Sequence, residues 1–182
     1  MDIIYTYRGE IKKGKPGEDK IIMAAKQFAK QAGINFDPET DEILRTENGK
    51  PYFKSGCMYF SLTHSWDMWM CIFSAEGEVG IDYQFITPID GERLARRFFP
   101  EDEAEYVELN GDEAFFEIWV KKESYAKMTG KGLMSRLQSM LSDVGADENG
   151  KYYFTKVNAG DEARCAVCRR HESPINMITL QV

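Results

Sequence analysis

The sequence predicts an α+β protein, and three observations lead to this class. Strand-like apolar segments and helical segments both occur, they alternate without a regular βαβ order, and each half of the chain offers a helix with about three strands. A length of 182 residues suits one domain or two small packed halves. We place the division between residues 1–78 and 79–182.

The first half begins with a strand and continues into an amphipathic helix. Residues 3–7 are apolar and rich in strand-forming side chains, whereas residues 12–17 form a basic turn with Gly and Pro. Gly33 ends the helix that follows, and residues 35–51 are polar and turn-rich. The apolar positions of this helix recur at helical spacing: Ile21, Ile22, Ala25, Phe28, Ala29 and Ala32.

Three further strands are expected near the middle of the chain. Residues 69–73 are apolar on both faces, which indicates a central strand, and residues 58–62 precede them. Residues 79–83 follow a Gly-containing turn and contain Asp82 close to their end. The polar residues 63–65 are expected to form a loop after the first of these strands.

The second half is expected to contain three helices followed by strands. The helices cover residues 92–99, 100–109 and 112–129, the last ending at Gly130. The strands cover residues 152–157, 164–169 and 177–182, with turn signals between them.

Composition excludes several classes of partner. Thirty Asp and Glu residues outnumber 23 Lys and Arg, so the net charge of −7 argues against non-specific binding to nucleic acid or to an anionic membrane. No apolar stretch is long enough to span a bilayer and no signal peptide is visible, so we expect a cytoplasmic protein. The four cysteines are expected to be reduced.

The longest predicted helix carries charged residues at positions where its row of apolar side chains, Phe115, Phe116 and Trp119, would be expected to continue. Trp119, Glu123 and Lys127 are four apart and share one face. An ordinary Glu-to-Lys pair would explain Glu123 and Lys127, but a bound cation or phosphate would also do so. We expect Glu117 and Lys121 to form a solvated pair.

Asp82 and Glu123 together offer two oxygen donors. Mg²⁺ typically uses one or two carboxylates, with water and substrate phosphates. A strand-end Asp is also a common turn former. Thr63, His64 and Ser65 fit either local bonds to the backbone or a phosphate site, and no Ser-His-Asp triad can be argued from their spacing.

An ordered set of motifs resembles the 4′-phosphopantetheinyl transferases of the surfactin-synthetase-activating type. The resemblance covers roughly residues 49–133 and depends most on the last motif. The motifs are GKP at 49–51, FSLTHS at 60–65, VGID at 79–82, RFF at 97–99 and WVKKESYAKMTGKGL at 119–133.

The resemblance implies a fold of two similar halves that form a pseudo-dimer, with the active site in the cleft between them. It implies transfer of the phosphopantetheine arm of coenzyme A to a serine of an apo acyl or peptidyl carrier protein, with Mg²⁺ as cofactor and release of adenosine 3′,5′-bisphosphate. Because both halves lie in one chain, a monomer is expected.

The resemblance also implies roles for individual residues. The catalytic residues would be Glu123 as base, Lys127 at phosphate and Asp82. Coenzyme A would be bound by Lys50, Pro51, Thr63, His64, Lys122, Lys127 and Lys13, the last assigned from charge and position. The metal would be held by Asp82, Glu123, Glu103 and Gln84.

Gln84 stands where members of this type often carry an acid. Its amide oxygen is neutral, so a weakened relative that only binds coenzyme A or a carrier protein is the second hypothesis, and an unrelated Mg²⁺-dependent nucleotide-binding protein is the third. Carrier proteins are commonly acidic, so we expect Arg93, Arg96 and Arg97, and also Lys131 with Arg136, to meet the carrier.

Overall fold

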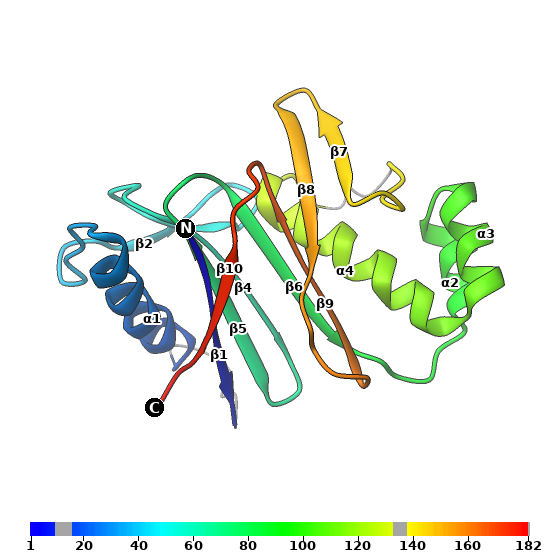
Figure 1. Cartoon of the computed structure of the whole chain (residues 1–182), viewed down its shortest axis with the longest axis horizontal. Helices are drawn as coiled ribbons and strands as arrows, with labels where there is room; N and C mark the ends of the chain where they lie inside the picture. Colours follow the sequence, from blue (N-terminus) through cyan, green and yellow to red (C-terminus); the bar gives the residue numbers. More distant parts are fainter. Residues whose placement is uncertain (10–15, 133–137, 182) are drawn as a thin grey trace.

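Two four-stranded sheets, each covered by a helix on its outer face, form the body of the molecule (Figure 1). The computed structural model describes residues 1–9, 16–132 and 138–181. Lys13 and Arg136 lie outside these ranges. The mixture of helices and sheets confirms the expected α+β class.

The strands of the first sheet come from both ends of the chain. Its order is β10-β1-β5-β4, and β10 pairs with β1 in parallel. The bounds are β1 Asp2–Arg8, β4 Tyr59–Ser65, β5 Met68–Ser74 and β10 Ile175–Thr179. The final strand of the sequence therefore crosses back to the sheet that contains the first.

The second sheet is antiparallel throughout, with the order β6-β9-β8-β7. Its strands are β6 Val79–Phe85, β7 Val144–Asp147, β8 Gly150–Lys156 and β9 Ala163–Arg169. A separate short hairpin consists of β2 Ile43–Arg45 and β3 Pro51–Phe53. The sequence did not predict β2, β3 or β7, because segments of three or four residues show too little alternation to be recognised.

The helices are α1 Pro16–Ala32, α2 Gly91–Phe98, α3 Glu101–Asn110 and α4 Asp112–Thr129. Helix α4 has the predicted bounds and ends at Gly130, whose φ of 68° is left-handed and suits a residue without a Cβ. No helix in the described part of the chain is both long and apolar enough to cross a bilayer.

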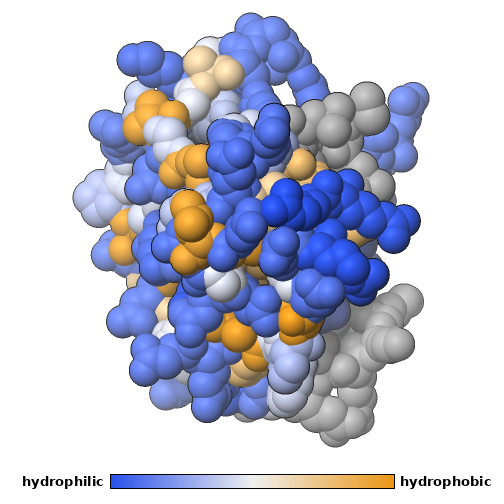
Figure 2. Space-filling model, turned by 90° about the vertical axis from the view of Figure 1, so that its right-hand side faces the viewer, coloured by the Kyte–Doolittle hydropathy of each residue, from blue (hydrophilic) through white to orange (hydrophobic). Residues whose placement is uncertain are grey.

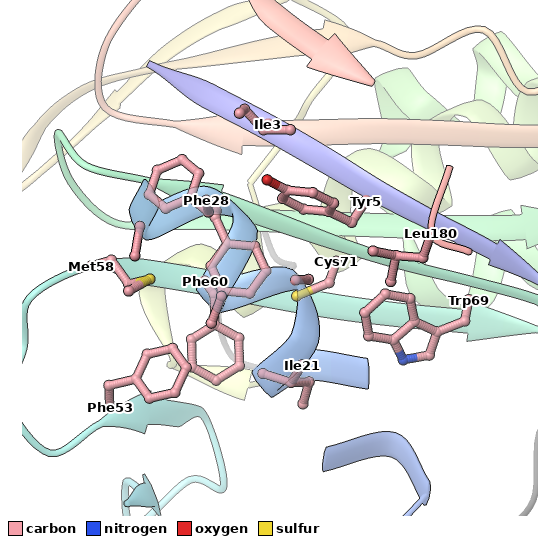
Figure 3. Packing of buried hydrophobic residues seen from close by; sticks show 14 residues of the cluster. Ile3, Tyr5, Ile21, Phe28, Phe53, Met58, Phe60, Trp69, Cys71 and Leu180 are labelled. Carbon is pink, nitrogen blue, oxygen red and sulfur yellow. The ribbon is translucent and has the colours of Figure 1, made fainter. Parts of the chain in front are cut away.

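Aromatic side chains fill the space between α1 and the first sheet. Figure 3 shows Phe28 of the helix close to Phe60, with Phe53 of the short hairpin beneath them. The ring centroids of Phe53 and Phe60 lie 4.8 Å apart, and Phe28 stacks on Phe73 at 5.6 Å. This core attaches the β2–β3 hairpin to the first sheet and so fixes one wall of the site described below.

A second core lies between the inner faces of the two sheets. Ile72 of β5 and Ile81 of β6 belong to it, together with Val167 of β9. Cys165 faces this core, whereas Cys168 faces α4, and both are free thiols, as expected. The sheets meet at β4 and β6, where the residues expected to form a loop after β4 are in fact part of the strand.

Candidate active site

Helix α4 crosses β6 at Gly80, and this crossing positions the charged residues of the site. A Cβ at Gly80 would lie 1.9 Å from the carbonyl oxygen of Ser124 and 2.5 Å from the amide of Met128. Any other residue would therefore separate the helix from the strand. Asp82 follows two positions later on the same side of the strand and thus faces the helix as well.

Asp82 forms an ion pair with Lys127 of α4. The Nζ atom of Lys127 lies 2.7 Å from Oδ1 of Asp82 and also donates to the carbonyl oxygen of Ile81 at 3.1 Å. Asp82 is buried, whereas Lys127 is partly exposed. The structure thus brings together Asp82 and Lys127, two of the residues expected at the site, from positions 45 apart in the chain. The sequence analysis did not predict that they would pair with each other.

Beside this pair lies a cavity of about 300 Å³ between helix α4 on one side and the β2–β3 hairpin with β4 on the other. Glu123 and Lys127, one helical turn apart on α4, border it from one side. The opposite wall comes from the β2–β3 hairpin and from β4, and includes Arg45, Lys50 and Pro51. Three cationic side chains and one carboxylate therefore surround the same space, which suits an anionic ligand.

The hairpin is attached to the C-terminal end of α4 by two side chains. Asn48 donates from Nδ2 to the carbonyl oxygen of Gly130 at 2.9 Å, and Lys50 donates from Nζ to that of Met128 at 2.6 Å. These bonds satisfy carbonyl groups that a helix end leaves without intrahelical partners. Lys50 also pairs with Glu78; burial lowers the pKa of Lys50, and the pairing opposes that shift.

Glu103 and Lys122, by contrast, point away from the cavity and pair with each other. Both are fully buried, with Lys122 Nζ 2.7 Å from Glu103 Oε2. Lys122 also donates to the carbonyl oxygen of Gln138, and Glu103 accepts from the amide of Met140. Because neighbouring helical residues are about 100° apart, Lys122 cannot share the face of Glu123. The structure thus shows Glu103 and Lys122 as a buried ion pair away from the cavity wall. The expected roles of Glu103 at the metal and of Lys122 at coenzyme A stay predictions.

The structure places Thr63 and His64 on β4 but not on the cavity wall. Thr63 is buried, and its hydroxyl bonds Asp82 and the amide of Tyr83. The side chain of His64 is exposed. Gln84 is partly exposed on the same side of β6 as Asp82, and Lys13 lies outside the described residues.

Among the polar residues of the cavity wall, the sequence analysis did not assign Arg45, Asn48 or Ser61 to the site. Arg45 and Asn48 lie in the segment that the sequence showed only as polar and turn-rich. Their proximity to the motif at Gly49-Lys50-Pro51 is the signal that could have indicated them.

The donor set is compatible with Mg²⁺ but is small. Within residues 1–9, 16–132 and 138–181, no group of three or more His, Cys, Asp or Glu side chains could hold a metal. Asp82 and Glu123 supply two carboxylates from adjoining elements, and Mg²⁺ commonly takes only one or two together with water and phosphate oxygens. The oxygen chemistry therefore fits this ion when a phosphate ligand is also present.

Comparison with known proteins decides the family. A sequence model of the 4′-phosphopantetheinyl transferase superfamily matches residues 78–177, which is more than half of the chain. The chain belongs to the 4′-phosphopantetheinyl transferase superfamily. This membership confirms the family that the motifs indicated.

Individual members of the phosphopantetheinyl transferase superfamily show the same relationship. The chain is 37% identical over 118 residues to psf-1 of Bacillus pumilus, covering 60% of this chain and 49% of that protein. It is 32% identical to gsp of Aneurinibacillus migulanus, and the match covers 68% of this chain and 52% of that protein. It is 31% identical to a transferase of Bacillus subtilis, and the match covers 77% of this chain and 65% of that protein. All three are named 4′-phosphopantetheinyl transferases. The chain spans about half the length of the curated relatives it matches.

Proposed function

We propose that the protein transfers the 4′-phosphopantetheine arm of coenzyme A to a serine of an apo acyl or peptidyl carrier protein. Membership of the superfamily supports this reaction class. The observation that carries the proposal is the cavity in which Glu123 and Lys127 of one half face Arg45 and Lys50 of the other. A nucleoside 3′-phosphate that carries a pyrophosphate at its 5′ position, as coenzyme A does, is the kind of anion that such a set of cations would bind.

The residues of the cavity suit an in-line transfer at phosphorus. The serine oxygen of the carrier forms a bond to the pantetheine-side phosphorus while the bond from this phosphorus to the bridging oxygen breaks. Glu123 accepts the serine proton, and adenosine 3′,5′-bisphosphate leaves with the electron pair of the broken bond. Lys127 stabilises negative charge on the phosphate oxygens, and Lys50 with Pro51 contacts the adenine-bearing end.

Asp82 and Glu123 are the residues that would hold Mg²⁺, with the amide oxygen of Gln84 as a weaker donor. When bound, the ion would neutralise charge on the pyrophosphate oxygens. Lys127 provides a positive charge at Asp82 in the present structure, at 2.7 Å from its Oδ1 atom. This pairing keeps the buried carboxylate compensated, because an unpaired buried charge is costly.

Two arginines of α2 that were expected to meet the carrier form ion pairs with acidic neighbours. Arg93 pairs with Asp90, while Arg96 pairs with Glu92 and with Glu108 of α3. The positive charges of these two arginines are thus balanced locally. Figure 2 shows that the side of the molecule with α2 and α3 is mainly hydrophilic, with separate hydrophobic spots. The expectation that Arg93, Arg96 and Arg97 meet the carrier stays a prediction.

One experiment tests the function directly. The protein is incubated with coenzyme A, Mg²⁺ and an apo carrier protein, and the carrier is weighed by mass spectrometry. We expect one phosphopantetheine adduct, and none on a carrier whose acceptor serine is replaced by alanine. Absence of the adduct, while a known transferase modifies the same carrier in parallel, would exclude transfer to that carrier.

A binding module is the alternative, because Gln84 supplies no negative charge at the metal donors. A weakened relative of this kind would bind coenzyme A, as measured by calorimetry, yet leave each carrier tested unmodified. Location in the cytoplasm and a monomeric state remain predictions.

A further inference from the structure

A row of hydroxyl groups joins the two sheets where β4 runs beside β6. The side chains at alternate positions of β4 accept hydrogen bonds from backbone amides of β6. The pairs are Ser61 with Ile81, Thr63 with Tyr83 and Ser65 with Phe85, at N···O distances of 3.2, 3.2 and 3.5 Å. Strand β6 is the edge of its sheet, so these hydroxyls satisfy amides that lack a neighbouring strand.

Thr63 makes one contact that the two serines are not seen to make. Its Oγ1 atom lies 3.1 Å from Oδ1 of Asp82. The amide of Tyr83 can only donate, so the hydroxyl accepts from it. The single hydroxyl proton of Thr63 is therefore directed to Asp82. The hydroxyl thus donates to Asp82 and accepts from Tyr83.

The Oδ1 atom of Asp82 thus receives donors from two different elements, Thr63 on β4 and Lys127 on α4. Two donors on one oxygen, held by a strand and a helix, restrict rotation of the carboxylate about its Cβ–Cγ bond. We propose that Thr63 is a positioning residue, which sets the orientation of the Asp82 carboxylate rather than binding a phosphate of coenzyme A.

The expected effect of Thr63 on the rate of transfer rests on the proposed function, whereas its contact with Asp82 does not. If Asp82 acts on the ligand through its orientation, loss of the Thr63 hydroxyl should act like loss of an outer-shell partner, which typically reduces activity by about 10- to 100-fold. Burial also matters: Thr63 and Asp82 are 4% and 7% exposed, so a carboxylate that loses this donor has little access to water as a replacement.

The kinetic test compares three variants in the carrier-modification assay. We expect Thr63→Val to lower kcat by about 10- to 100-fold with less than a threefold change in KM for coenzyme A, and Thr63→Ser to restore most of the rate. Ser65→Ala, which removes a hydroxyl from the same row without touching Asp82, should remain within about threefold of the unchanged protein. A rise in KM with kcat retained would instead support phosphate binding by Thr63 and overturn the proposal.

A second measurement does not depend on transfer. Thr63→Val is expected to lower the melting temperature by about 3–10 °C, from loss of a hydrogen bond to a charged group. In an Asp82→Ala background this drop should shrink by at least half, while the effect of Ser65→Ala should be the same in both backgrounds. Equal drops for Thr63→Val in the two backgrounds would refute the coupling, and this result would stand even if no carrier were modified.

Discussion

Lys122 and Glu103 form an ion pair that is fully shielded from solvent, with 2.7 Å between Nζ and Oε2. Burial raises the pKa of Glu103, which indicates the cost of keeping its carboxylate charged in the interior. We expect Lys122→Met to destabilise the protein by about 3–5 kcal/mol, because it leaves that carboxylate without its partner. The double variant Lys122→Met with Glu103→Leu should recover much of the loss. Urea unfolding measures both, and a double variant less stable than the single one would contradict this account.

The pair of Asp147 and Arg170 predicts a pH dependence of stability. Hydrogen bonds from Arg170, at 2.7 and 2.8 Å, are the main cause that lowers the pKa of Asp147 from 3.8 to about 2. A lowered folded-state pKa means that the stabilisation is present above the unfolded pKa and is lost as pH falls toward 2. We expect Asp147→Asn to lower the free energy of unfolding by about 1–2 kcal/mol near neutral pH. This difference in stability between the variant and the unchanged protein should become smaller as the pH falls from about 4 to 2. Denaturant titrations of both proteins across this pH range test the prediction. A difference in stability that does not change with pH would refute it.

Gly80→Ala should disrupt the contact between α4 and β6. The added Cβ meets backbone atoms of the helix, which cannot move aside as a side chain can. We expect Gly80→Ala to lower the free energy of unfolding by more than about 3 kcal/mol, or to prevent folding altogether. Gly17→Ala is the matched control, because nothing lies within 4 Å of the added atom, and it should be neutral or slightly stabilising. Thermal unfolding followed by circular dichroism separates the two, and similar curves would show that the close approach is not required.

Asn48→Ala tests the attachment of the β2–β3 hairpin to α4. Without the 2.9 Å bond to Gly130, the cavity wall that carries Lys50 is less firmly held. We expect the affinity for coenzyme A to fall about 3- to 10-fold with little change in melting temperature. Glu47→Ala, an exposed neighbour in the same turn, is the control. Calorimetric titration gives the affinity of each variant for coenzyme A. Equal affinities for Asn48→Ala and Glu47→Ala would show that the bond from Asn48 to Gly130 does not hold the cavity wall in place.

Glu123→Gln should reduce transfer far more than Gln84→Ala. The first change removes the group that accepts the serine proton, and acid–base catalysis of this kind contributes about 10²–10⁴-fold. The second removes a neutral donor that water can replace, so we expect less than a tenfold loss. Rates of carrier modification for both variants check this, and comparable losses would contradict the assigned roles.

The features that could be predicted from sequence are those set by local chemistry. Helix α4 was predicted with its bounds because Gly111 and Gly130 delimit a long segment that contains neither Gly nor Pro. Glu123 and Lys127 were selected because charged groups stood on helix positions that packing would fill with apolar ones, and Asp82 because it lies at the end of a predicted strand. Lys127 pairs with Asp82 and borders the same cavity as Glu123.

The features that sequence missed depend on partners distant in the chain. Glu117 and Lys121 were expected to pair, but Glu117 bonds Lys156 and Lys121 pairs with Asp143, because strands and loops packed on α4 offer competing charges. The polar residues after Leu62 continue β4 because they pair with β5, and the hydroxyls of Thr63 and Ser65 accept hydrogen bonds from a strand of the other sheet. Periodicity along one segment carries no information about such contacts.

The pairing of β10 with β1 determines when the first sheet can be completed. Asp2 lies opposite Ile175, so synthesis must pass residue 175 before β1 acquires its second neighbour. During synthesis one edge of β1 is therefore open while the other pairs with β5. The two halves that the motifs suggest are consequently not successive folding units, since the earlier half depends on the latest residues for its own sheet.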